Sequence, residues 1–294
     1  MSERPVVQPG HAEAMARAFD RPIFLAGRGR SGTSLLARLF DGHPEVWSAP
    51  GETLVFTEIA PRMRETGDRA AAAAALAQRF PAPSRDVDAA LTAAVAGLDL
   101  ADPALPRRLL EIGMARWGRQ HPPGPAVAFL EKTPKNEDHL PALFAAFPTA
   151  RVLYLLRDPR AVHVSNARSE TYRMEPAFVA HQWLKSVRRI LAYVGREDAA
   201  SAIRVVRFED LVADPEGTMR SLCAFLGLAW SDALLAPTVR GRPWEGNSYD
   251  PAKLTPDGVA ARKADEWRDE ISAGSKAAIE DAAGFEMSLL GYRT

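Results

Sequence analysis

The chain has 294 residues, 47% of them hydrophobic and 25% charged, and its 37 basic residues equal its 37 acidic residues in number. A chain of this length buries a substantial core, and we favour one large α/β domain over two small ones. A formal net charge of zero creates no broad field to attract nucleic acid or an anionic membrane surface, so we expect neither as a partner and expect any anion site to be local.

The sequence also limits redox chemistry and targeting. Its one cysteine, Cys223, excludes an internal disulfide, and the apolar residues around it indicate a buried core thiol. The N-terminal residues lack the apolar core of a signal peptide, and no apolar run is long enough to span a bilayer. We therefore expect a soluble, cytoplasmic protein without a membrane span.

The first predicted elements are a strand and a helix joined by a glycine-rich turn. Ile23–Ala26 form a short apolar run between Pro22 and Gly27, and Ser34–Phe40 have helical spacing. The backbone N–H groups of such a turn and the positive end of the helix dipole stabilise a bound anion. This segment predicts a site for a phosphate-like group.

The turn differs from a nucleoside-triphosphate P-loop at one position. A P-loop has the pattern G-x-x-x-x-G-K-[ST]. Gly27, Gly32 and Ser34 fall in this register, but Thr33 occupies the place of the lysine. Arg30 supplies a cation near the same turn, so the loop predicts a phosphate ligand of a different kind.

The loop resembles that of the sulfotransferases that use 3′-phosphoadenosine 5′-phosphosulfate (PAPS), especially the bacterial and Golgi-type branch that includes tyrosylprotein sulfotransferases. In that family the pattern G-x-x-[RK]-[ST]-G-[ST]-[ST] holds the 5′-phosphosulfate, and the chain matches it at every position. The resemblance implies PAPS as co-substrate, adenosine 3′,5′-bisphosphate as product and no metal. The implied donor-binding residues of the loop are Gly27, Gly29, Arg30, Ser31, Gly32, Thr33 and Ser34.

A helical region follows the loop. Residues from about 54 to 120 have helical character, including the alanine run Ala70–Ala75 and a second helix over Ala104–Arg119. We interpret residues 54–120 as an insertion that shapes an acceptor pocket.

A second strand is predicted at Val127–Leu130, and it runs directly into Glu131 and Lys132. Parallel-sheet enzymes place their chemistry at the carboxyl ends of strands, so Lys132 is a candidate site residue; a solvated lysine beside a turn is the alternative. The resembled family commonly has E-K-T-P-x-N here, which Glu131–Asn136 match. The resemblance implies that Lys132 donates to the transferring sulfonate and the leaving phosphate.

The clearest strand is Arg151–Leu156, which is almost continuously apolar, as a parallel strand covered on both faces should be. It ends at Arg157, next to Asp158, so a structural ion pair is one interpretation of Arg157. In the resembled family an arginine at this strand end and a serine eight residues later hold the 3′-phosphate. Arg157 and Ser165 have that spacing, and each half of the motif supplies the context that the other requires.

The remaining segments complete the expected fold. Glu175–Val194 has the apolar stripe of a core-facing helix. Ile203–Arg207 is a further strand followed by Phe208, for which packing is the expected role and an approach to the adenine is the alternative. Ser275–Leu290 is a terminal helix that closes the core with Trp267. Thr238–Gly258 is expected to be a long surface loop. The resemblance implies that such a loop covers the adenosine, with candidates Arg240, Arg242, Gly246, Asn247 and Ser248.

In-line sulfonate transfer requires cations on the developing negative charge and a base for the acceptor proton. Arg30 and Lys132 are the expected cations. Glu52 is the expected base, because tyrosylprotein sulfotransferases place a catalytic glutamate before a threonine at nearly this distance from the loop. A helix cap is the alternative role of Glu52, and His43 and His163 are alternative bases.

The sequence thus predicts a single domain over residues 1–294, with a P-loop-like, three-layer α/β fold and a mainly parallel central sheet flanked by helices. The predicted reaction is PAPS-dependent sulfonation of a hydroxyl or amine on a small-molecule, carbohydrate, lipid or peptide acceptor. Two alternatives stay open. One is a P-loop small-molecule kinase, which requires Mg²⁺ and a lysine in the loop. The other is a non-catalytic nucleotide-binding module, which has no use for Lys132 or Glu52.

Overall fold

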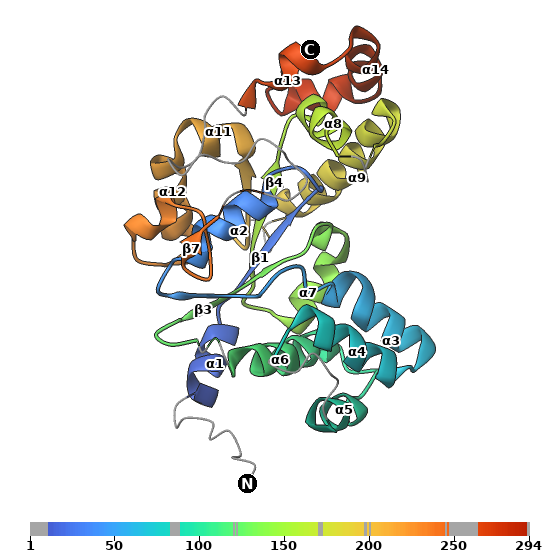
Figure 1. Cartoon of the computed structure of the whole chain (residues 1–294). Coiled ribbons are helices and arrows are strands. Elements are labelled where there is room, and N and C mark those ends of the chain that lie inside the picture. The colour runs from blue at the N-terminus through green and yellow to red at the C-terminus, as the bar shows by residue number, and fades with distance from the viewer. Residues whose placement is uncertain are drawn as a thin grey trace. The chain divides into compact units, whose positions relative to one another are not determined.

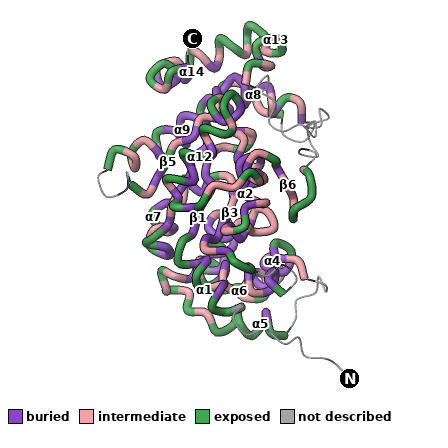
Figure 2. Tube along the Cα trace, turned by 90° about the vertical axis from the view of Figure 1, so that its left-hand side faces the viewer, coloured by how far each residue is buried: buried purple, intermediate pink, exposed green. Residues whose placement is uncertain are grey.

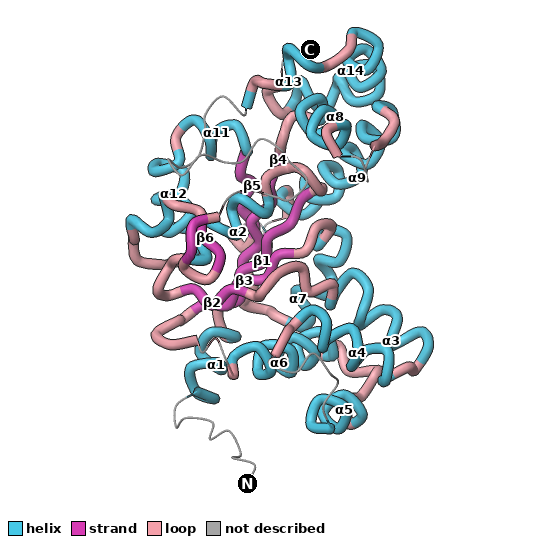
Figure 3. Tube along the Cα trace, viewed as in Figure 1, coloured by secondary structure: helices cyan, strands magenta, loops and turns pink. Residues whose placement is uncertain are grey.

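The computed structural model describes residues 11–82, 89–119, 121, 123–169, 173–196, 199, 201–244, 246 and 264–292 (Figure 1). Five strands form one sheet in the order β2-β3-β1-β4-β5. They are β1 (Pro22–Gly27), β2 (Val46–Ser48), β3 (Ala128–Lys132), β4 (Arg151–Leu156) and β5 (Ile203–Arg207). The pairs β2–β3 and β4–β5 are parallel. Helices make up most of the other described residues, which confirms the predicted α/β class with a mainly parallel sheet flanked by helices (Figure 3).

The chain divides into two compact units, and the first comprises Met1–Phe24 and Pro44–Arg151. Its helices are α1 (His11–Phe19), the π-helix η1 (Val55–Ile59), α3 (Ala60–Thr66), α4 (Arg69–Arg79), α5 (Ala89–Ala96), α6 (Leu105–Gly118), the 3-10 helix η2 (Asn136–His139) and α7 (Leu140–Ala146). Helices α3 to α6 pack on one another, so the predicted helical character of residues 54–120 is confirmed. The alanine run lies in α4, which begins after Asp68, a cap that accepts from the Ala71 N–H.

The core of the first unit is a cluster of buried aromatic rings. Phe19 on α1 stacks on Phe129 of β3 with ring centroids 4.6 Å apart, and Phe24 of β1 lies 5.3 Å from Phe147. All four side chains have at most 1% exposure, and Figure 2 shows the buried residues running along β1 and β3. The rings therefore hold α1 against the strand that ends in Lys132.

The second unit comprises Leu25–His43 and Val152–Thr294. Its helices are α2 (Thr33–Asp41), α8 (Pro159–Ala167), α9 (Pro176–Val194), α11 (Phe208–Ala213), α12 (Pro215–Leu226), the 3-10 helix η3 (Asp232–Leu235), α13 (Trp267–Glu270) and α14 (Ala273–Leu289). Helix α9 packs on α8 and α14, and Trp267 is buried against Ala161 and Val164. The core roles predicted for α9, α14 and Trp267 are confirmed, and Cys223 is buried as expected.

The predicted loop over 238–258 is wrong at its start. Two short strands, β6 (Thr238–Val239) and β7 (Arg242–Pro243), pair antiparallel there. Arg240 and Gly241 join them with φ angles of 54° and 71°, the left-handed pair that a tight hairpin turn requires. Asp41 accepts from the Thr238 hydroxyl and the Gly241 N–H and so ties the hairpin to α2. Asn247 and Ser248 lie outside the described residues.

Among the residues that the structure describes, no helix has both the length and the apolarity needed to cross a membrane.

Candidate functional site

Two glycines give the loop after β1 its shape. Gly27 has a φ of 133°, and a Cβ at this position would lie 2.6 Å from the carbonyl oxygen of Leu155 on β4. Gly32 has a φ of 98°, and its Cβ would lie 2.4 Å from the ring of Phe208. A side chain fits at neither position. The glycine spacing of the motif therefore reflects two close approaches of the backbone to neighbouring elements.

The loop delivers the chain into α2 at Thr33. Gly32 is the N-cap of α2, and because it has no side chain, it brings no acceptor of its own to the N–H groups of the first turn. The Ser31 N–H donates to the Arg28 carbonyl, which closes the turn, and Ser31 and Thr33 are both buried. This arrangement suits a bound anion.

The two predicted halves of the donor site meet within the second unit. Arg30 has a left-handed backbone, with a φ of 73°, and its Nε donates to the Ser165 Oγ on α8 at 3.0 Å. Nη1 of Arg157, directly after β4, donates to the Arg30 carbonyl at 2.9 Å. The loop and the Arg157–Ser165 motif, 127 and 135 residues apart at these contacts, thus form one cationic cluster.

Arg157 makes two further contacts besides its hydrogen bond to the Arg30 carbonyl. Its guanidinium lies 4.1 Å from the centroid of the Phe208 ring, and its carbonyl accepts from the Trp183 Nε1 at 2.9 Å. Burial lowers the pKa of Arg157 to about 10; the charge of Glu209 opposes this shift, and those of Arg30 and Arg168 add to it. Arg157 therefore stays charged at neutral pH in a crowded positive environment, which an anion would relieve.

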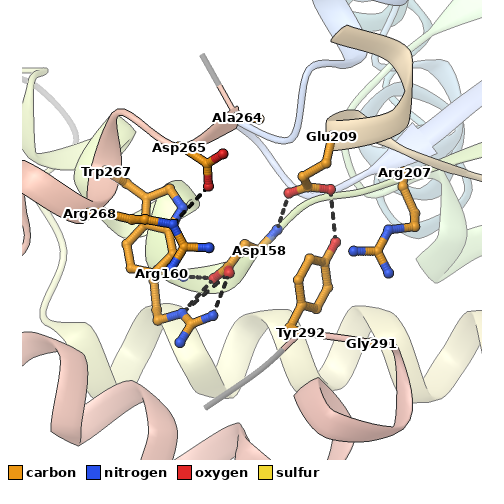
Figure 4. Close-up of a pocket in the computed structure, with 10 residues that line it drawn as sticks. All are labelled: Asp158, Arg160, Arg207, Glu209, Ala264, Asp265, Trp267, Arg268, Gly291 and Tyr292. Atoms are coloured by element: carbon orange, nitrogen blue, oxygen red, sulfur yellow. Dashed lines mark hydrogen bonds and ion pairs between the residues drawn. The ribbon is translucent and has the colours of Figure 1, made fainter. Parts of the chain in front are cut away.

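The partly buried carboxylate of Glu209 anchors the turn after Arg157, and Figure 4 shows its two contacts. Glu209 accepts from the Asp158 N–H at 2.9 Å and from the Tyr292 hydroxyl at 3.1 Å, and burial raises its pKa. Asp158 caps α8 and pairs with Arg160 at 2.7 Å. The carboxylate of Asp158 thus has a partner in Arg160. These residues line a cavity of about 210 Å³ together with Arg207 and Trp267.

In the first unit, Lys132 and Glu52 form an ion pair. The Lys132 Nζ lies 2.8 Å from the Glu52 Oε1, and the side chains are 12% and 40% exposed. Lys132 is the last residue of β3. The interpretation of Lys132 as a solvated side chain is therefore wrong. The carboxylate of Glu52 contacts the Lys132 ammonium group and does not cap the helix that follows.

Glu131, directly before Lys132, belongs to the sequence motif, but sequence reasoning gave it no role. It is fully buried and accepts from the hydroxyls of Thr53 and Thr133 at 2.7 and 2.6 Å and from the Asn136 amide at 2.7 Å. Burial raises its pKa, although the three hydrogen bonds oppose the shift. The available sequence signal was an acidic residue at the end of an apolar strand, directly before Lys132.

The two histidines proposed as alternative bases lie in the second unit. His43 is buried and its Nε2 lies 2.8 Å from the Ala229 carbonyl oxygen, which fixes the ring in the core. Burial lowers the pKa of His163 on α8, so its neutral form is favoured. Within the described ranges, no group of three His, Cys, Asp or Glu side chains has an arrangement that holds a metal.

Comparison with known proteins gives a consistent set of matches. A model of the Sulfotransferase family matches residues 22–232. Protein-tyrosine sulfotransferase 1 of Danio rerio is 31% identical over 72% of this chain and 55% of its own, and protein-tyrosine sulfotransferase 2 of Gallus gallus is 30% identical over 72% and 53%. The chain spans about half the length of these curated relatives.

Solved structures share the fold. The sulfotransferase domain of the Synechococcus PCC 7002 olefin synthase has a TM-score of 0.56 and 24% identity, with 88% of this chain and 94% of that chain covered. The sulfotransferase domain from the curacin biosynthetic pathway has a TM-score of 0.60 and 20% identity, with 92% and 97% covered. At these identities the likeness concerns the fold.

The close approach of Gly32 to Phe208 predicts that Gly32→Ala destabilises the protein. The added methyl group overlaps the ring and the backbone is in the left-handed region, so we expect a loss of about 2–4 kcal/mol in the free energy of unfolding, measured by urea titration. Gly29→Ala is the matched control, because its Cβ has no atom within 4 Å and should leave stability unchanged. Equal stability of the two variants would contradict the assigned contact.

The buried Glu131 carboxyl predicts a pH-dependent stability. Its folded pKa is raised above the ordinary value of 4.5, so the unfolded chain releases this proton first and stability falls as pH rises from about 4.5 through the folded pKa. Glu131→Gln removes this effect. The free energy of unfolding of the variant minus that of the wild type should therefore increase with pH in this window, and a difference that stays constant across it would contradict the raised pKa.

Proposed function

This chain belongs to the sulfotransferase family, and from that membership we propose that it transfers the sulfonate group of PAPS to an acceptor hydroxyl by in-line displacement. The predicted family and the predicted transferase class are confirmed. The choice of PAPS as the donor is part of the proposal, as are the individual site residues.

The observation that carries the proposal is the cluster of Arg30, Arg157 and Ser165 in the second unit. A bisphosphorylated adenosine carries phosphate at two separate positions, and the cluster joins a loop suited to the 5′-group with the residues expected at the 3′-group. Thr33, buried at the position of a P-loop lysine, argues against a kinase, which needs that cation on the triphosphate.

In the proposed step the acceptor oxygen forms a bond to sulfur while the bond between sulfur and the bridging oxygen of the 5′-phosphate breaks. The acceptor proton passes to Glu52, and adenosine 3′,5′-bisphosphate leaves. Lys132 and Arg30 stabilise the charge that develops on the sulfonate and the leaving phosphate. The ion pair of Glu52 with Lys132 supports this division of roles, because it keeps a carboxylate and a cation together in advance of the reaction.

The acceptor is proposed from the printed names of the relatives, which are protein-tyrosine sulfotransferases. A peptide tyrosine is therefore the first acceptor to test, followed by small-molecule, carbohydrate and lipid hydroxyls. The cytoplasmic location and the single-domain organisation stay predictions.

Binding of adenosine 3′,5′-bisphosphate should depend on Arg157 and Ser165 and not on a metal. Calorimetry should show the wild type binding this product without Mg²⁺, with affinity at least about tenfold lower in Arg157→Ala, since hydrogen bonds to charged groups contribute about 1.5–3 kcal/mol. Arg157→Lys should lie between them, because lysine keeps the charge but loses the planar fork.

Two controls make this binding experiment decisive. Arg220→Ala removes an exposed arginine that pairs with Glu216 on α12 and should leave the affinity unchanged. ATP with Mg²⁺ should bind weakly. Tight binding of ATP with Mg²⁺, together with no binding of the bisphosphate, would instead support the kinase.

Glu52 and Lys132 should affect turnover more than donor binding. We expect Glu52→Gln and Lys132→Met each to lower the rate of adenosine 3′,5′-bisphosphate formation from PAPS about 10²–10⁴-fold, the usual range for a general base or a charge-stabilising donor. Their affinity for the bisphosphate should change much less. Lys135→Asn removes an exposed lysine at a left-handed position, which asparagine tolerates, and should keep the wild-type rate.

A further inference from the structure

The structure places a buried hydrogen-bond network directly behind the Glu52–Lys132 pair. Its centre is Glu131, which has no measurable exposure. The three side chains that donate to it belong to the two segments that carry the pair: Thr53 follows Glu52, and Thr133 and Asn136 follow Lys132. Both segments lie in the first unit.

Two neighbouring residues of β3, Glu131 and Lys132, contact two neighbouring residues of the segment that contains Glu52 and Thr53. Because side chains alternate along a strand, Glu131 and Lys132 point to opposite sides of β3. Glu131 accepts from Thr53 at 2.7 Å and Lys132 lies 2.8 Å from Glu52. Two adjacent contacts on opposite sides of β3 fix the register and the rotation of the Glu52–Thr53 segment relative to this strand.

Thr133 adds a contact to the backbone of that segment. Its Oγ1 donates to Glu131 and accepts from the N–H groups of Thr53 and Leu54 at 3.1 and 3.2 Å. Leu54 has a φ of 56°, which is unfavourable for a leucine, and a π-helix begins directly after it. Strained residues persist where the surrounding contacts over-determine them, and Thr133 supplies two of those contacts.

We propose that Glu131 is a positioning residue, which acts through Thr53 and Thr133 to hold Glu52 at ion-pair distance from Lys132. The inference rests on the proposed function for its catalytic meaning, since Glu131 itself touches neither substrate nor donor. The contacts of Glu131 with Thr53 and Thr133 and the distance between Glu52 and Lys132 do not depend on the proposed function.

A buried carboxyl group is a costly way to fill a core position, because its oxygens need donors in place of water. Replacing both partners of a buried polar contact with apolar groups of the same shape can be neutral or stabilising for a fold. Here each of the three donors to the carboxylate comes from a segment that bears one member of the pair. An arrangement selected only for stability has no need to join these two segments through one carboxylate.

The test measures the ion pair directly by acylation of lysines with acetic anhydride, quantified by mass spectrometry. Lys132 is 12% exposed and paired, whereas Lys135 in the same peptide is exposed and serves as the internal reference. We expect a low ratio of Lys132 to Lys135 modification in the wild type. Thr133→Val keeps the shape and removes the hydroxyl, with its contacts to Glu131 and to the Thr53 and Leu54 N–H groups. It should raise the ratio at least about fivefold, since the net loss of even one hydrogen bond has an effect of this order.

Companion variants separate position from packing. Thr133→Ser restores the hydroxyl and should restore the wild-type ratio. Glu131→Gln is isosteric and should raise the ratio less than Thr133→Val does, because its oxygen still accepts from the threonines. An unchanged ratio in folded Thr133→Val and Glu131→Gln would overturn the proposal.

Turnover of PAPS then tests the catalytic consequence. In the same variants the rate of adenosine 3′,5′-bisphosphate formation should fall in proportion to the rise in the modification ratio, with rescue by Thr133→Ser and unchanged affinity for the bisphosphate. A raised ratio with an unchanged rate would overturn the catalytic role of the pair, which is a failure of the proposed function. An unchanged ratio is a failure of the positioning alone, so the two are distinguishable.

Discussion

Carboxyl groups removed wholly or partly from water near strand ends impose the main constraint on this structure, because their oxygens have to be met by hydrogen-bond donors or by an opposite charge. Glu131 meets this requirement in the first unit with three side-chain donors. Glu209 meets it in the second unit with the Asp158 N–H and the Tyr292 hydroxyl. In each unit the acid thereby fixes a segment next to a predicted site residue, Lys132 in one and Arg157 in the other.

One aromatic ring links the loop after β1 to the residues that follow β5. The ring of Phe208 occupies the space that a side chain at Gly32 would need, and its face lies under the Arg157 guanidinium. Phe208 is buried, as the expected packing role requires. The Phe208 side chain therefore limits how closely the loop approaches and also packs against the Arg157 guanidinium. A displacement of the loop at Gly32 is transmitted to Arg157 through this ring.

The sequence predicted the elements that a local pattern of residues, such as a short apolar run, is sufficient to indicate. The observed bounds of β4 and β5 coincide with the predicted strands, because each is a run of largely apolar and β-branched residues. The structure brings both residues of the predicted Arg157–Ser165 motif to Arg30, whose carbonyl accepts from Arg157 and whose Nε donates to Ser165. Strand β2 was missed because three residues are too few for a periodic signal. The β6–β7 hairpin was missed because its turn uses Arg240 in a left-handed conformation that arginine seldom adopts.

The Glu131 network escaped prediction for a different reason. Its partner Thr53 is 78 residues away in the chain, and no periodicity or turn signature relates the two. The sequence motif showed Glu131 only as a neighbour of Lys132, while its burial and its partners arise from the tertiary contact of the two segments.

Strain at Leu54 explains why Glu52 does not cap the helix that follows it. A carboxylate just before a helix ordinarily interacts with the helix N-terminus. The left-handed conformation of Leu54, which costs about 1–3 kcal/mol for a residue of this kind, turns the chain between Glu52 and η1, and both N–H groups at the turn donate to Thr133. Glu52 is thereby directed to Lys132. The backbone geometry that is unfavourable locally is the one that brings the carboxylate and the ammonium group together.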